Sequence, residues 1–210
     1  MNFTNVDSDW KKINEIITSC SKILLTTHEN PDGDGLGSEV AMYHHLIEIG
    51  KDVKIINCSI TPAMFDYINI NDCIETYDES NHLDWIKECE LVVVFDVGDF
   101  SRTRIVKDAV EKFKIPVMNI DHHPHPEKHG FAYNIVDIKS AATGCMVRSY
   151  LKVARSAPLN KKICDGIYTA VMTDTGCFKY SNTDTFCPVS YTHLRAHETD
   201  SYLVCRLLLE

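Results

Sequence analysis

Short apolar runs alternate with helix-like segments along this chain, and the alternation constrains the fold more than any other feature of the sequence. Residues 91–95 (LVVVF) are apolar without interruption, which is typical of a strand buried on both faces of a parallel sheet. Other strands are predicted at residues 23–27, 52–57, 74–77, 115–120 and 131–136. Helices are predicted near residues 10–17, 40–49, 105–113, 141–153 and 161–171. We therefore expect an α/β fold, a three-layer sandwich with a mostly parallel sheet.

The composition is that of a globular protein, and 210 residues are enough to enclose one sizeable core. The first residues lack the basic and then apolar order of a signal peptide, and no apolar run approaches the roughly 18 residues of a membrane span. Nine cysteines occur without a C-x-x-C pair, which indicates neither a zinc knuckle nor a disulfide framework. We expect a cytoplasmic protein with no membrane partner.

The formal net charge of −9 argues against tight binding of long nucleic acid, because such binding relies on a positive surface. A short anionic substrate held by metal ions remains compatible with this charge. The sequence does not determine the oligomeric state, and a homodimer stays open.

A stretch rich in glycine and carboxylate, residues 26–38, follows the first predicted strand and reads as the turn into a helix. It places His28, Asp32 and Asp34 within seven residues, which is more ligand chemistry than an ordinary turn requires. Its glycines do not have the G-x-G-x-x-G spacing of a dinucleotide-binding loop, and its two carboxylates would repel a pyrophosphate. A metal site explains the stretch better.

Three candidate ligands lie just past the ends of three different predicted strands. His28, Asp96 and His122 each occupy such a position. Because ligands bind beyond the carboxyl ends of the strands in parallel α/β sheets, we expect these three side chains to converge on one edge.

Carboxylate and imidazole ligands without thiolate suit Mn²⁺, or alternatively Mg²⁺, better than structural zinc. The full candidate set is His28, Asp32, Asp34, Asp96, His122 and Asp174. Its four carboxylates carry −4, which two dications would neutralise. Two such ions can activate a hydroxide and stabilise a developing phosphoryl charge, so the ligands point to hydrolysis of a phosphate ester.

The same residues carry a resemblance to a known family. The segments are His28-x-Asn30-Pro31-Asp32-x-Asp34, the lone Asp96, Asp121-His122-His123, and Thr173-Asp174-Thr175-Gly176-x-Phe178. In order and spacing they resemble the four motifs of the DHH phosphoesterase family, from about residue 23 to residue 183. Within that family the likeness is to the type that degrades oligoribonucleotides and 3'-phosphoadenosine 5'-phosphate (pAp).

The resemblance implies a division of the ligands between two ions. His28, Asp32 and Asp96 would hold one ion. The second would be held by Asp34, Asp96, His122 and Asp174. Asp96 would therefore bridge the two ions and belong to the catalytic machinery.

The resemblance also implies roles for residues around the metal ligands. His123 would be catalytic, either binding the substrate phosphate or assisting the leaving group. Asp121 would orient the histidines. Asn30 and Arg102 are further candidates for supporting or substrate contacts, although Arg102 could equally complete the start of a helix. His125 and His129 follow in a polar loop, where we expect them to be solvated, although one of them could contact the substrate.

Residues 140–144 resemble a family segment that opens a helix near the site. Cys145 stands where an acidic residue is expected soon after Gly144, which puts the contribution of this segment in question.

The family resemblance ends near residue 183. We therefore expect a catalytic domain over residues 1–186. Residues 187–210 resemble translated sequencing-adapter read-through, and we expect them to be a non-native tail.

The leading functional hypothesis is a metal-dependent hydrolase of short oligoribonucleotides, pAp or both, acting through a hydroxide activated by two metal ions. An inorganic pyrophosphatase or exopolyphosphatase of the same family is the alternative enzyme. A metal-binding fragment with little activity is the alternative from another class, because the substrate domain of the family is missing from this sequence.

Overall fold

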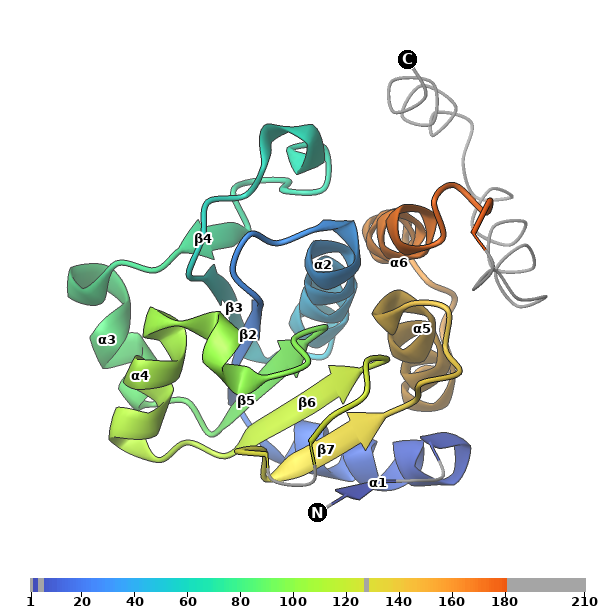
Figure 1. Ribbon diagram of the computed structural model, residues 1–210. Coiled ribbons are helices and arrows are strands. Elements are labelled where there is room, and N and C mark those ends of the chain that lie inside the picture. Colours follow the sequence, from blue (N-terminus) through green and yellow to red (C-terminus); the bar gives the residue numbers. More distant parts are fainter. Residues whose placement is uncertain (1, 4–5, 127–128, 181–210) are drawn as a thin grey trace.

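The computed structural model describes residues 2–3, 6–126 and 129–180 as a single parallel sheet covered by helices on both faces (Figure 1). The strands are β1 (Asn2–Phe3), β2 (Lys22–Thr27), β3 (Asp52–Asn57), β4 (Ile74–Thr76), β5 (Leu91–Phe95), β6 (Val117–Asp121) and β7 (Tyr133–Val136). The helices are α1 (Val6–Ser19), α2 (Gly33–Glu48), α3 (Glu79–Lys87), α4 (Ile105–Phe113), α5 (Thr143–Ala154) and α6 (Lys161–Asp174), with short 3-10 helices η1 (Ala63–Phe65) and η2 (Phe100–Thr103).

The described strands form one seven-stranded sheet in the order β1-β7-β6-β5-β2-β3-β4, with every pair parallel. From β2 the chain builds β3 and β4 on one side, and it then returns to place β5, β6 and β7 on the other. The strand order therefore reverses between β2 and β5. In sheets of this kind, ligands bind beyond the carboxyl ends of the strands at such a reversal.

Strand β5 is buried on both faces and separates two cores. Leu91, Val93 and Phe95 pack with α1, α2, α5 and α6, whereas Val92 and Val94 pack with α3 and α4. Each of these side chains is at most 1% exposed, and burying one contributes about 1.5–3 kcal/mol. The predicted three-layer α/β sandwich is confirmed.

Helices α2 and α6 lie in close contact because glycines meet where they cross. A Cβ atom on Gly37 would lie 2.3 Å from the carbonyl oxygen of Gly166, and one on Gly166 would lie 2.6 Å from the carbonyl oxygen of Gly37. This contact packs the helix that ends at Asp174 against the helix that begins at Gly33. The close packing thus brings the last ligand motif to the first.

The structure differs from the sequence-based expectations in a few elements. Helix α3 and the short strand β1 have no counterpart among the predicted elements. The expected non-native tail, residues 187–210, lies outside the described residues, as does the end of the expected catalytic domain. Within the described part of the chain, no helix is long and apolar enough to cross a membrane.

Candidate metal centre

The first motif forms the junction between β2 and α2, and helix α2 begins inside it. Asp32 is the N-cap residue, and its Oδ1 accepts hydrogen bonds from the backbone N–H groups of Asp34 (3.0 Å) and Gly35 (3.2 Å). The helix predicted near residues 40–49 therefore begins earlier than expected, at Gly33. The earlier start puts Asp34 in the first helical turn, where it is buried.

His28 follows β2 directly and presents one ring nitrogen to the site. Its Nδ1 lies 2.7 Å from the backbone oxygen of Glu29, which can only accept a hydrogen bond, so Nδ1 carries the proton. In the neutral ring the lone pair is then on Nε2, which lies 3.7 Å from Oδ2 of Asp32 and 3.8 Å from Oδ2 of Asp96. This tautomer is the one that a metal ligand requires.

Asp96 follows β5 and stands between the other candidate ligands. Its backbone adopts a φ of 57°, a left-handed conformation that aspartate tolerates better than most residues. One carboxylate oxygen, Oδ2, faces His28, whereas Oδ1 lies 3.6 Å from Nε2 of His122 and accepts a hydrogen bond from Oγ1 of Thr143 (3.2 Å). The two oxygens of one buried carboxylate therefore serve two different groups of side chains.

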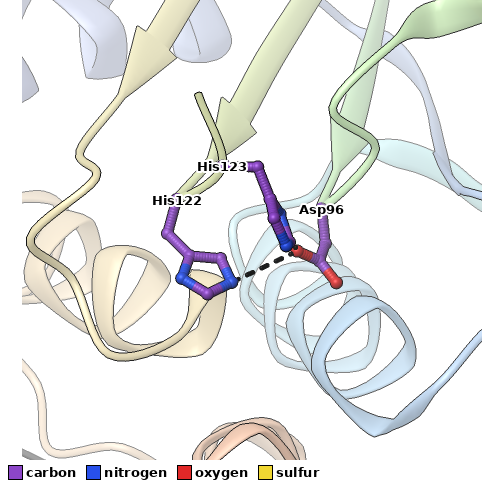
Figure 2. Close-up of side chains that lie close together, drawn as sticks. All are labelled: Asp96, His122 and His123. Atoms are coloured by element: carbon purple, nitrogen blue, oxygen red, sulfur yellow. Dashed lines mark ion pairs between the residues drawn. The ribbon is translucent and has the colours of Figure 1, made fainter. Parts of the chain in front are cut away.

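His122 follows β6 and points its Nε2 toward the carboxylate of Asp96 (Figure 2). Its Nδ1 donates to the backbone oxygen of Ser140 (3.2 Å), which leaves Nε2 with the lone pair. Nε2 lies 3.6 Å from an oxygen of each of Asp34, Asp96 and Asp174, and it has no hydrogen-bond partner although it is buried. Buried polar atoms rarely lack a hydrogen-bond partner, so this nitrogen is a candidate to bind a metal ion.

Asp34 is held in place by backbone N–H groups at the start of α5. Its Oδ2 accepts from Thr143 (2.7 Å) and its Oδ1 from Gly144 (2.9 Å). Residues 140–144 thus contribute to the site through their backbone, and the missing acidic side chain at Cys145 does not prevent this. The contribution was in question because Cys145 is not acidic, and a sequence pattern does not show the backbone donors that make it.

The carboxylates of the site repel one another. Burial, followed by the charges of Asp96 and Asp174, raises the pKa of Asp34 well above its ordinary value. Burial likewise raises the pKa of Asp174, even though the neighbouring His122 opposes the rise. Bringing these groups together as anions requires a compensating positive charge.

The donor set and its spacing fit divalent cations. Three groups among the described residues could each hold an ion, and in each group the ligand atoms lie within 4.8 Å of one another. They are His28 with Asp32 and Asp96, Asp34 with His122 and Asp174, and Asp96 with His122 and His123. Two ligands about 2.1 Å from a shared ion lie about 3–4 Å apart, which matches the distances above. Oxygen and imidazole donors without thiolate suit Mn²⁺ or Mg²⁺.

Asp121 accepts hydrogen bonds from two histidines and one backbone N–H group, and so orients the histidines beside the metal ligands. Its Oδ1 accepts from Nδ1 of His123 (2.9 Å), and its Oδ2 accepts from Nε2 of His125 (2.8 Å) and the N–H of Gly98 (2.6 Å). The side chain of His125 is only 4% exposed, so the expectation that it is solvated was wrong. Hydrogen bonds to Asp121 and then to Asp96 raise the pKa of His123 to about 10, and its side chain is 47% exposed.

The remaining two candidates lie at the margin of the site. Asn30 is exposed and has a φ of 52°, and its N–H donates to Oγ of Ser59 (3.1 Å). The guanidinium of Arg102 donates to the backbone oxygen of Val97 (3.2 Å) within the segment that follows β5. Their contact with a substrate stays a prediction.

The fold and the site together define a class of protein, in which a parallel α/β sheet carries a carboxylate–histidine centre at the reversal of its strand order. Comparison with known families narrows that class. Residues 22–171 match the model of the DHH family, N-terminal domain, and the chain belongs to this family. The resemblance inferred from the motifs is confirmed.

Curated relatives share the family and extend beyond this chain. The chain is 29% identical over 161 residues to the bifunctional oligoribonuclease and PAP phosphatase NrnA of Thermus thermophilus, covering 77% of this chain and 45% of that protein. It is 26% identical over 164 residues to the protein of the same name from Bacillus subtilis, covering 77% and 48%. The chain therefore spans about half the length of the curated relatives it matches.

Solved structures share the fold. An exopolyphosphatase-related protein from Bacteroides fragilis superimposes with a TM-score of 0.87 at 24% identity, covering 97% of this chain and 61% of the other. A putative family II inorganic pyrophosphatase from Methanococcus jannaschii gives a TM-score of 0.64 at 14% identity, covering 89% and 60%. At these identities the likeness concerns the fold alone.

Proposed function

We propose that this chain is the catalytic part of a metal-dependent phosphoesterase that hydrolyses short oligoribonucleotides, pAp or both. The observation that carries the proposal is the buried carboxylate of Asp96, with Oδ2 facing His28 and Oδ1 facing His122. A carboxylate shared in this way is what a two-metal phosphoesterase requires. The names of the similar curated proteins support the substrate class.

Two divalent cations, Mn²⁺ before Mg²⁺, fit the residues present. His28, Asp32 and Asp96 would hold one, and Asp34, Asp96, His122 and Asp174 the other. When bound, such ions lower the pKa of an attacking water and stabilise charge on the phosphoryl group.

The protein's own groups would bind the substrate and handle protons around the ions. His123 is half exposed at the site, and its ion pairs with Asp121 and Asp96 favour the protonated ring in the metal-free protein, so it would bind a phosphate oxygen and could supply a proton to the leaving oxygen. Burial opposes ionisation of Asp121, but hydrogen bonds from His123 and His125 hold its pKa well below the usual range. Asp121 therefore remains an anion that fixes the orientation of His123.

The test combines metal binding with turnover. We expect wild-type protein to bind two Mn²⁺ per chain in a calorimetric titration and to hydrolyse pAp or a dinucleotide faster than pyrophosphate. Asp96→Asn removes the shared carboxylate and is expected to abolish two-ion binding and turnover. Asp99→Asn is the matched control, because Asp99 lies in the same loop but caps η2, and asparagine also caps helices well.

Each alternative has its own outcome in this experiment. Unchanged turnover in Asp96→Asn, or a single Mn²⁺ at saturation, would refute the two-metal mechanism. Preference for pyrophosphate or polyphosphate would favour the pyrophosphatase or exopolyphosphatase alternative. Binding of Mn²⁺ without turnover of any substrate would favour the metal-binding fragment with little activity.

A further inference from the structure

The backbone of Arg104 adopts a conformation that side chains disfavour. Its φ of 50° and ψ of −123° lie in a region that glycine populates and other residues rarely enter. The residue links η2 to α4, on the segment that follows Asp96. Such a conformation persists only when the surrounding structure holds it, and it is most frequent at functional sites.

The side chain of Arg104 makes one strong contact, with Glu29 in the first ligand motif. Nε of Arg104 donates to Oε2 of Glu29 (2.7 Å), and Nη2 donates to Oε1, so the pair is bidentate. The backbone ties the same two segments together, because the N–H of Glu29 donates to the carbonyl oxygen of Arg102 (2.8 Å). The loop after β2 is therefore clamped to the loop after β5.

Glu29 is also the residue that orients His28. Its backbone oxygen accepts the Nδ1 proton of His28 (2.7 Å), and that hydrogen bond points Nε2 toward Asp32 and Asp96. A movement of the Glu29 backbone would thus turn the imidazole of a candidate metal ligand. An ordinary exposed ion pair contributes little to stability and would not by itself compensate for a disfavoured backbone.

We infer that Arg104 is a positioning residue for the metal centre: its ion pair with Glu29 holds the carbonyl group that orients His28. This inference rests on the proposed function, because it concerns a ligand of the proposed metal centre. It predicts that Arg104 contributes to metal affinity and contributes nothing to the stability of the metal-free protein, where its backbone is unfavourable.

The test measures Mn²⁺ affinity and metal-free stability in the same set of variants of the 210-residue chain. In Arg104→Gly we expect an unchanged or raised melting temperature without metal, because glycine accepts this backbone, together with a weaker Mn²⁺ affinity. Partners of ligating histidines contribute about 10–100-fold to metal affinity, and we expect about 3–10-fold here because Arg104 acts one residue further away. Glu29→Ala keeps the backbone carbonyl, removes both acceptor oxygens of the ion pair and should weaken Mn²⁺ binding similarly.

A double variant and a control complete the design. Arg104→Gly combined with Glu29→Ala should lose no more affinity than either single change, because both remove the same contact. Lys107→Ala is the matched control, since it removes a cation from α4 that pairs with Glu111 and not with Glu29. Its Mn²⁺ affinity should equal that of the wild type.

Three results would overturn the inference. Wild-type Mn²⁺ affinity in Arg104→Gly, with or without a fall in melting temperature, would make the residue purely structural. Additive losses in the double variant would show that the two side chains act separately. Absence of Mn²⁺ binding in the wild-type protein would overturn the proposed metal centre and this inference with it. That failure is seen in the wild type, whereas failure of the inference alone is seen only in the variants.

Discussion

Glu39 gives the sharpest prediction, because a buried carboxyl group makes the stability of this protein depend on pH. The side chain lies on α2 with no exposed surface. Its Oε2 accepts a hydrogen bond from Nδ2 of Asn57 (2.9 Å), and its Oε1 has no hydrogen-bond partner. Burial raises its pKa from 4.5 to about 8, with the hydrogen bond from Asn57 opposing the rise.

The sign and size of the effect follow from proton linkage. The folded protein binds the Glu39 proton more tightly than the unfolded chain does, so this stabilising contribution is complete below pH 4.5 and is lost as the pH rises through about 8. Each pH unit between these values removes about 1.4 kcal/mol of unfolding free energy. The loss is therefore about 3 kcal/mol at pH 7 and about 5 kcal/mol once the pH exceeds 8. Glu39→Gln keeps the oxygen that accepts from Asn57 and does not ionise.

The assay is urea unfolding of the wild type and Glu39→Gln at several pH values from 5 to 8.5. We expect the variant to be the more stable protein at neutral pH, by up to about 3 kcal/mol, and the difference to grow between pH 5 and pH 8. Glu15→Gln, an exposed position on α1, is the control and should run parallel to the wild type. A constant difference between Glu39→Gln and wild type across this range would refute the reasoning.

Three further predictions concern packing, metal and the hydrogen bonds of Asp121. Gly166→Ala should lower the unfolding free energy by about 1–3 kcal/mol, because the added Cβ meets the backbone oxygen of Gly37. Gly130→Ala is the control, since the nearest atom to its added Cβ is 3.9 Å away. Equal melting temperatures of the two variants would contradict this prediction. Mn²⁺ at 100 times its dissociation constant should raise the unfolding free energy by about 2.7 kcal/mol for each bound ion, and EDTA should reverse the effect; an unchanged melting temperature would count against the metal centre. His125→Ala should cost about 1–3 kcal/mol in urea unfolding, since buried Asp121 loses a donor, and wild-type stability would argue against the contribution of this hydrogen bond.

Much of this protein could be predicted from local sequence. The apolar run at residues 91–95 predicted a strand with two buried faces, and the structure shows Leu91–Phe95 between two cores. Side chains placed after successive strands had to meet at one edge, because parallel strands all end there. For that reason His28, Asp96 and His122 were expected to converge before any distance was known.

Only the tertiary structure decided how the side chains of the site are held. The N–H groups of residues 143–144 that bind Asp34 leave no mark in a sequence pattern, because every residue but proline carries the same donor. The side chain of His125 is buried against Asp121 at the end of β6 and beside the ring of Phe131, and the side chain of Arg104 meets a partner 75 residues away. The sequence by itself determined which chemistry is present and at which sheet edge it gathers. Long-range packing decided the tautomers, the shared position of Asp96 and the supporting contacts, because these depend on distances between segments that are remote in the chain.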